Sequence, residues 1–192
     1  MRWAGVERIM AASLQFNFVG GDVGPWMIER IEPVAGPSLP VAAKLAILAG
    51  RDSQIPIGSS WVLRGATGNV RYSSKDETAS LRNKQEGLDR PSSVCAALIP
   101  VRKIDAWWEL SQDERRQIIE ERSHHIELGL KYLPAIARRL HHCRELGEPF
   151  DFLTWFEFAP DHSDRFEELL GLLRQTEEWS YVDREVDIRL RR

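Results

Sequence analysis

The sequence has little cysteine: only Cys95 and Cys143 occur among 192 residues. Neither lies in the CxxC spacing that is typical of a metal site. The two could pair as a disulfide, but we interpret both as reduced thiols that are buried or idle. The sequence also contains no HExxH motif, no GxxxxGK[ST] phosphate loop and no GxGxxG loop, and their absence argues against the metalloprotease, P-loop and dinucleotide-binding classes.

Long apolar runs and an excess of basic charge are also missing. No stretch approaches the roughly 18 apolar residues of a membrane span. Arg2 and Arg8 are not followed by the apolar run of a signal peptide, because Gln15 and Asn17 interrupt it. The net charge of -3 is unlike that of a nucleic-acid binder. We therefore expect no membrane and no nucleic-acid partner, and a cytoplasmic location, with a periplasmic one left open.

The first half of the chain has the pattern of strands and turns. Residues 14–19 alternate apolar and polar side chains, as a half-buried strand does, and the apolar run 95–101 is typical of a strand buried on both faces. Residues 32–60 are rich in Pro, Gly and Ser, which favours short strands joined by loops. The predicted elements are strands over 14–19, 26–31, 61–71 and 95–101, and a charged surface helix over 74–88.

The second half has a clearer pattern of helices and strands. Ser111 and Glu114 form a capping box, which predicts the start of a helix. Gly129 and Pro134 interrupt the helical pattern, since proline disfavours helical geometry at the preceding residue. The predicted elements are a helix from 111 through the pair His124–His125, a second helix over 135–144, a strand over 151–158, a helix over 162–176 and a strand over 181–190.

This order of elements predicts an α+β fold with ferredoxin-like halves. We place a degenerate N-terminal half at 1–92 and a C-terminal half at 93–192. No sequence repeat relates the two halves. The C-terminal half contains the residues with the clearest chemical potential.

A haem site is one reading of those residues. Such a site needs an imidazole on iron, a group that holds the second ring nitrogen, flat apolar surroundings and a cation on the open face of the ring. The side chains that match these needs are His125, Arg138, Trp107, Trp108 and Trp155. Each also has an ordinary reading, because a lone helical histidine is usually packed or solvated and tryptophans usually belong to a core.

The spacing of His125 and Arg138 adds a constraint. In one unbroken helix the two would stand roughly 20 Å apart, which is too far to flank one porphyrin. A turn at Gly129 and Pro134 would bring them together. The geometry therefore permits a sandwich without naming the ring or the reaction.

The segments 106–116, 121–126, 130–140, 147–157, 176–179 and 185–190 resemble the chlorite dismutase family. Residues 18–22 and 69–72 are similar to its N-terminal half, so the resemblance covers most of the chain. The short length is similar to the dimeric branch of the family. The resemblance implies two ferredoxin-like repeats that form an α+β barrel, a homodimer, and a haem b enzyme that converts chlorite to chloride and dioxygen.

The resemblance also implies roles for individual residues. His125 matches the iron ligand, and His124 does not, because only His125 has the family's interval to the catalytic Arg138. Glu178 matches the carboxylate behind the imidazole, with Glu177 as the next candidate. The residues that match haem contacts are Trp107 and Trp108, with Tyr72 and Trp155 assigned near the site.

Three alternatives stay open at this stage. A coproheme decarboxylase of the same fold generally has Gln where this chain has Arg138. A dye-decolourising peroxidase would be helped by an acid near Arg138, and the sequence shows none. A non-catalytic haem protein, or an interaction domain without a cofactor, would share the fold without turnover.

Overall fold

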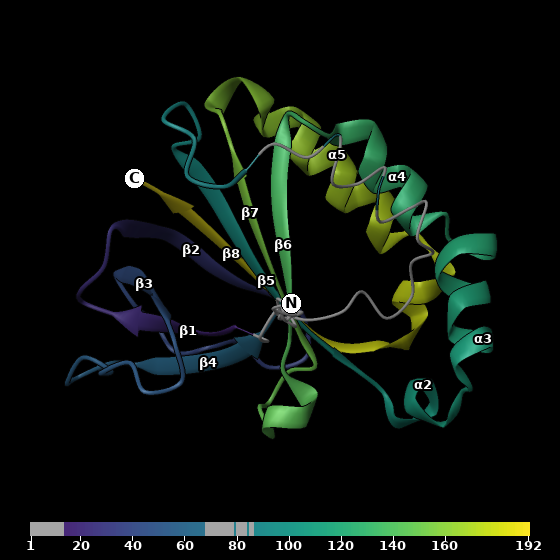
Figure 1. Cartoon of the computed structure of the whole chain (residues 1–192), viewed down its shortest axis with the longest axis horizontal. Coiled ribbons are helices and arrows are strands. Elements are labelled where there is room, and N and C mark those ends of the chain that lie inside the picture. Colours follow the sequence, from purple (N-terminus) through teal and green to yellow (C-terminus); the bar gives the residue numbers. More distant parts are fainter. Residues whose placement is uncertain (1–13, 68–78, 80–83, 85–86) are drawn as a thin grey trace, which may run out of the picture.

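Eight antiparallel strands form a closed barrel (Figure 1) in the computed structural model of the chain, which describes residues 14–67, 79, 84 and 87–192. Their order around the barrel is β1-β3-β2-β8-β5-β7-β6-β4. The α+β barrel expected from the sequence is therefore confirmed. The strands are β1 Gln15–Gly21, β2 Trp26–Ala35, β3 Lys44–Ala49, β4 Trp61–Ala66, β5 Cys95–Lys103, β6 Ile136–His142, β7 Phe152–Phe158 and β8 Val182–Arg191.

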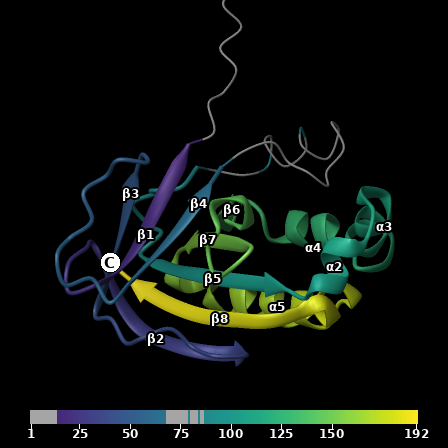
Figure 2. The ribbon, with the colours of Figure 1, turned by 90° about the horizontal axis from the view of Figure 1, so that it is seen from below.

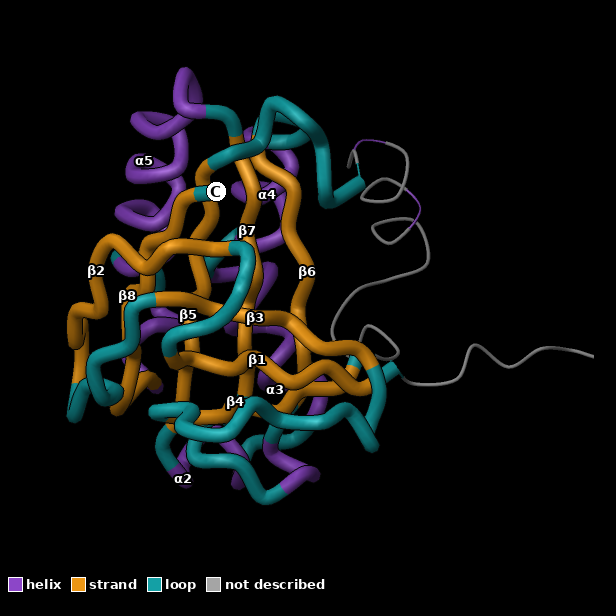
Figure 3. Tube along the Cα trace, turned by 90° about the vertical axis from the view of Figure 1, so that its left-hand side faces the viewer, coloured by secondary structure: helices purple, strands orange, loops and turns teal. Residues whose placement is uncertain are grey.

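The helices α2 to α5 lie together on one side of the barrel, and Figure 3 shows β1, β3 and β4 on the side away from them. In Figure 2, α5 lies along β5 and β8. None of the helices in the described part of the chain is long and apolar enough to cross a bilayer. The helical elements are α2 Asp105–Glu109, α3 Gln112–Arg116, the π-helical η1 Gln117–Arg122, α4 His125–Tyr132, η2 Arg144–Leu146, η3 Pro160–His162, α5 Ser163–Arg174 and η4 Glu177–Tyr181.

The alternation of side chains along β7 separates two cores. Leu153 and Trp155 face the barrel interior, whereas Phe156 and Phe158 face outward and pack with Phe166 of α5. Strands alternate faces with a period of two residues, so neighbouring strands share this division. The outer face beneath the helices is the one that carries the candidate site.

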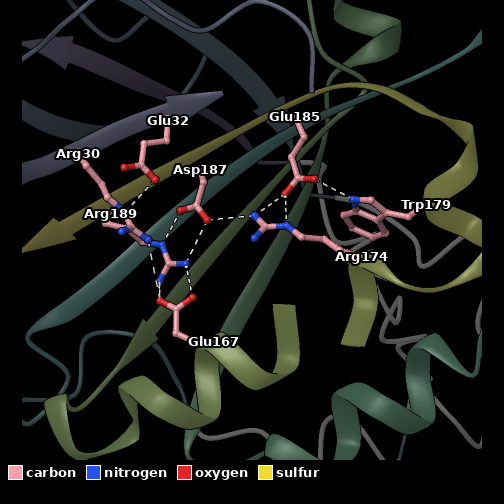
Figure 4. Close-up of polar contacts among 8 residues, drawn as sticks. All are labelled: Arg30, Glu32, Glu167, Arg174, Trp179, Glu185, Asp187 and Arg189. Carbon is pink, nitrogen blue, oxygen red and sulfur yellow. Dashed lines mark hydrogen bonds and ion pairs between the residues drawn. The ribbon is translucent and has the colours of Figure 1, made fainter. Parts of the chain in front are cut away.

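A network of charges ties α5 to the outer face of β8 (Figure 4). Arg174 of α5 donates hydrogen bonds to Glu185 at 2.6 Å and to Asp187 at 3.0 Å, and both carboxylates are buried. Burial alone would raise the pKa of Asp187, but the hydrogen bonds from Arg189 and Arg174 outweigh it and lower that pKa. The network therefore fixes the register of α5 on the strand. Its remaining contacts join Arg189 to Glu167 and Asp187, Arg30 to Glu32 and Glu167, and the Trp179 indole to Glu185.

Two predictions for the second half are wrong. Residues 135–144 do not form a helix, because Ile136–His142 pairs with β7 along its whole length as β6, and this pairing overrides the helix propensity of Ala, Arg and Leu. The helix predicted from 111 is broken at Ser123 and His124, where His124 has a left-handed φ of 50°. Gly129 lies inside α4, whereas α4 does end just before Pro134 as expected.

The strands predicted over 14–19, 26–31, 95–101, 151–158 and 181–190 and the helix over 162–176 are confirmed with small shifts of their ends. The strand predicted over 61–71 is confirmed as β4 over Trp61–Ala66, and residues 68–71 lie outside the described residues. The region 32–60 contains the end of β2 and the whole of β3 between its loops. Most of the surface helix predicted over 74–88 lies outside the described residues. The division into halves at 92 and 93 stays a prediction.

A buried histidine lies inside the barrel on the inner face of β6. His141 is 2% exposed, and its ring meets the rings of Phe16 and Phe18 edge-on at 5.3 and 5.0 Å. Its Nδ1 lies 3.2 Å from the carbonyl oxygen of Leu153. Burial lowers the pKa of His141 from 6.5 to about 4, so the folded barrel favours the neutral imidazole.

This pKa predicts a loss of stability in mild acid. Between pH 6.5 and about 4 the unfolded chain protonates His141 and the folded chain does not, so stability falls as pH drops through that window. The contribution is about 3 kcal/mol, since each pH unit between the two pKa values is worth about 1.4 kcal/mol. We expect His141→Leu to remove this part of the pH dependence in urea unfolding at pH 7 and pH 4. The control His162→Leu should keep the full dependence, and an unchanged slope in His141→Leu would contradict the assignment.

Candidate functional site

The candidate site begins at the N-terminus of α4. The side chain of Glu120 accepts a hydrogen bond from the backbone N–H of Ile126 at 2.7 Å, which satisfies one of the free donors at a helix start. This contact and the left-handed turn at His124 make His125 the first residue of α4. Glu120 could not be singled out from the sequence, because the pattern there predicts one continuous helix without a new N-terminus to cap.

His125 is held by a buried carboxylate. Its Nδ1 lies 2.7 Å from Oε2 of Glu178, and Oε1 of Glu178 lies 3.0 Å from Nζ of Lys103. Burial alone would raise the pKa of Glu178, but its interactions with His125 and Lys103 outweigh it and hold that pKa well below its ordinary range. An ionised carboxylate only accepts hydrogen bonds, so Nδ1 of His125 is the donor and Nε2 keeps its lone pair for a metal ion.

Two further hydrogen bonds fix Glu178. Nζ of Lys103 also donates to the carbonyl oxygen of Glu178 at 3.0 Å, and Oγ of Ser123 accepts from its backbone N–H at 3.1 Å. Lys103 is itself buried, and its ammonium lies over the rings of Trp107 at 4.7 Å and Trp179 at 5.4 Å. Lys103 was not among the residues predicted for the site. A lysine two residues beyond the apolar run 95–101 was the available signal.

The structure distinguishes Glu178 from Glu177 and His125 from His124. Glu178 contacts His125, whereas Glu177 forms an ion pair with Arg122 at 2.6 Å on the surface. The side chain of His124 is 60% exposed and lies 3.6 Å from Glu127. Of these candidates, only the half-buried His125 and the buried Glu178 therefore form an imidazole–carboxylate pair.

Arg138 reaches the same face of α4 from β6. It is opposite Phe156 in the β6–β7 register, which places it on the outer face of the barrel. A Cβ added to Gly129 would lie 3.2–3.3 Å from the guanidinium of Arg138. Residues four apart share one face of a helix, so His125, Gly129 and Arg138 converge.

Arg138 keeps its charge in this setting. Burial lowers its pKa, and the negative charges of Glu120 and Glu178 oppose that effect. Arginine has so high an ordinary pKa that it stays cationic at working pH. The α4 side of the barrel therefore carries a permanent cation close to Gly129, one helical turn from His125.

The turn between α4 and β6 brings Arg138 back toward α4. Arg90 donates hydrogen bonds to the carbonyl oxygens of Pro134 and Ala135, both at 3.0 Å. The turn after Pro134 was expected, but its anchor was not, because Arg90 is distant in sequence. This anchor fixes the point from which β6 starts.

The two neighbouring tryptophans have different surroundings. Trp107 is 1% exposed and packs with Ile118, Ile119 and Tyr181. Trp108 is stacked on Phe152 with ring centroids 6.0 Å apart, and the guanidinium of Arg144 lies 4.2 Å from its ring. Nε1 of Trp108 is buried and has no hydrogen-bond acceptor among the residues the structure describes. This N–H is therefore available to an acceptor on a bound molecule.

The remaining two candidates do not join this group. Trp155 faces the barrel interior, where its ring lies 5.2 Å from that of Trp26 and its Nε1 donates to Glu157 at 2.9 Å. The alternation along β7 thus places it on the opposite face of the sheet from Arg138. This corrects the expectation that Trp155 lies near the site. Tyr72 lies outside the described residues.

The donor set suits haem better than a bare cation. The described part of the chain has no group of three or more His, Cys, Asp or Glu side chains that could hold a metal ion. One imidazole with a carboxylate behind it can serve as an axial ligand of a haem iron. The buried N–H of Trp108 can donate to a haem carboxylate. The residues present therefore fit the prosthetic group.

Comparisons with known proteins identify the family of the chain. The family model described as chlorite dismutase matches residues 58–191. A crystal structure of a dimeric chlorite dismutase from Nitrobacter winogradskyi is 55% identical, with 92% of this chain and 99% of that chain covered and a TM-score of 0.87. A mutant chlorite dismutase from Candidatus Nitrospira defluvii, 18% identical with a TM-score of 0.70, covers 98% of this chain and 95% of its own, and shares the fold.

A curated relative matches a shorter segment. The chlorite dismutase from Ideonella dechloratans is 33% identical over 97 residues, which are 50% of this chain. The match spans 33% of the length of that relative.

The buried ion pair of Lys103 and Glu178 predicts a large effect of one substitution. Lys103→Met leaves the Glu178 carboxylate buried without its cation, and we expect the free energy of unfolding to fall by about 3 kcal/mol or more. The matched control is Arg122→Met, which removes the exposed partner of Glu177 and should cost less than about 1 kcal/mol. Urea unfolding of the full chain measures both. Equal losses in the two variants would show that Lys103 does not support Glu178.

Proposed function

The chain belongs to the chlorite dismutase family, and we propose that it is a haem b enzyme that converts chlorite to chloride and dioxygen. One observation carries the proposal: His125, half-buried and held by the buried Glu178, lies one helical turn from Gly129, against which the cation of Arg138 lies. The names of the similar proteins support the choice of chlorite as substrate.

In this proposal the haem is held from the α4 side. Nε2 of His125 would bind the iron, because Nδ1 is committed to Glu178. Trp107 and Trp108 would contribute to the haem site, and the buried N–H of Trp108 could donate to a haem carboxylate. The haem, when bound, supplies the iron at which chlorine–oxygen bonds break and the oxygen–oxygen bond forms.

Glu178 acts through His125. A hydrogen bond from Nδ1 to a carboxylate raises the basicity of the imidazole and fixes its orientation. Lys103 shares the negative charge of Glu178 and keeps the carboxylate in place. The three residues together set how much electron density the imidazole gives to the metal.

Arg138 acts on the substrate side of the site. Its guanidinium stays cationic and offers several N–H donors, so it attracts chlorite and holds the anionic species formed from it. Its burial strengthens this attraction, because charges interact more strongly away from water. Holding the reactive chlorine species also protects the enzyme from bleaching.

We further propose a homodimer in the cytoplasm. The Nitrobacter winogradskyi protein is described as dimeric and is similar over nearly its whole length. The cytoplasmic location rests on the expectation from the sequence alone.

The alternatives of the same fold differ in what they do with chlorite. A coproheme decarboxylase is disfavoured by Arg138, and a non-catalytic haem protein would bind haem without turnover. Adding chlorite to the haem-loaded chain and recording dioxygen with an electrode separates these readings. Sustained dioxygen release supports the proposal, and haem binding without dioxygen overturns it.

Arg138→Ala should lower chlorite turnover by about 100-fold, since one preorganised charged donor is lost. It should also reduce the number of turnovers before the haem bleaches. The matched control is Arg139→Ala, because Arg139 is an exposed neighbour on the same strand. Wild-type turnover and endurance in Arg138→Ala would contradict the role of Arg138.

His125→Ala should weaken haem binding by more than about 100-fold, because the iron loses its protein ligand. Titration of the haem-free chain with haem, followed at the Soret band, measures this loss. The control is His124→Asn, since asparagine tolerates the left-handed backbone at that position. Full loading of His125→Ala with an unshifted Soret band would refute the assignment.

A further inference from the structure

Gly129 occupies a costly position for a glycine. It lies in the interior of α4, where glycine weakens a helix relative to alanine. Its backbone is not among those with positive φ, so conformational freedom does not explain the residue. The residue is buried, and the remaining reason for a glycine is space.

The space beside Gly129 belongs to Arg138. The three heavy atoms nearest to an added Cβ are Nη2 at 3.2 Å and Cζ and Nη1 at 3.3 Å, all from the Arg138 guanidinium. These distances are tighter than nearly all real Cβ contacts, so one partner must move by a few tenths of an ångström. The Cβ is fixed to the helix, whereas the guanidinium ends a flexible side chain. An alanine at this position would therefore displace Arg138.

We propose that Gly129 is a positioning residue for Arg138, which gives the guanidinium its contact with the helix that carries His125. The inference rests on the proposed function in one respect: the ligand that would sense the displacement is a small anion at the haem iron. Gly129 lies one helical turn from His125. The missing side chain thus sets how closely the cation approaches the imidazole face.

Gly171 is a matched control within the same chain. It lies in α5, and a Cβ added there would meet nothing within 4 Å. Gly129→Ala and Gly171→Ala therefore make the same chemical change in two helices, and only the first introduces a contact with Arg138.

The first test uses the haem-free full chain and does not depend on the proposed function. Gly171→Ala should raise the melting temperature by about 2 °C, since alanine favours the helix. Gly129→Ala should give no such gain alone, but should gain about 2 °C in an Arg138→Ala background, where the contact is gone. Equal gains from Gly129→Ala in both backgrounds would overturn the inference.

The second test uses the haem-loaded ferric protein and fluoride as the anion. Gly129→Ala should weaken fluoride binding by about three- to tenfold, because small misplacements of a binding group are costly. Gly171→Ala should leave it unchanged, and Gly129→Ala should have no effect on fluoride in the Arg138→Ala background. The Soret shift during titration measures the affinity. An equal loss with and without Arg138 would show that Gly129 does not act through it. A wild-type chain that binds no haem would refute the proposed function, and the melting temperatures alone would then decide this inference.

Discussion

The buried carboxylate of Glu178 is the interaction on which the candidate site depends. It joins three elements: β5 through Lys103, α4 through His125, and η4, on which it lies. An ionised carboxylate is tolerated in such a place only with charged or hydrogen-bonding partners on every oxygen. The same partners that make its burial possible also orient the imidazole. One set of contacts therefore stabilises the buried carboxylate in the fold and orients the imidazole of His125.

The division of the barrel into two faces explains why the site lies outside and not inside it. The interior is filled by aromatic and aliphatic side chains together with the neutral His141. The outer face of β5 to β8 carries an apolar cluster that packs on α5, together with charged side chains such as Arg138 and Glu185, and the helices lie against it (Figure 1). Arg138 and His141 lie on the same strand only three residues apart, yet on opposite faces. One serves the site, and the other belongs to the core.

The sequence predicted much of the fold and part of the site. The capping box at Ser111, the alternation in β7 and β8 and the stop at Pro134 are local signals, and the structure follows them. The helix predicted over 135–144 is wrong, because Ala, Arg and Leu favour a helix locally and only pairing with β7 makes the segment a strand.

Contacts between distant segments could not be predicted from spacing. The resemblance supplied His125, Arg138 and Glu178, but the 2.7 Å contact that distinguishes Glu178 from Glu177 needs the packing of η4 on α4. Lys103 and Arg90 act across 75 and 44 residues of sequence, and their partners cannot be identified from the residues around them. Trp155 is a residue type that often contacts haem, but the register of β7 places it on the inner face of the barrel.

The charge network between α5 and β8 has a consequence for precision. Apolar packing is non-directional, so a helix held only by Phe166, Leu169, Leu170 and Leu173 could slide along the sheet at small cost. The hydrogen bonds of an ion pair depend on distance and angle, and a slip of one turn would separate Arg174 from Glu185 and Asp187. The next element after α5 is η4, whose Trp179 is bonded to the same Glu185. The charge network thus fixes the position of the chain from α5 to Trp179, and Trp179 is the immediate neighbour of Glu178, whose carboxylate holds His125.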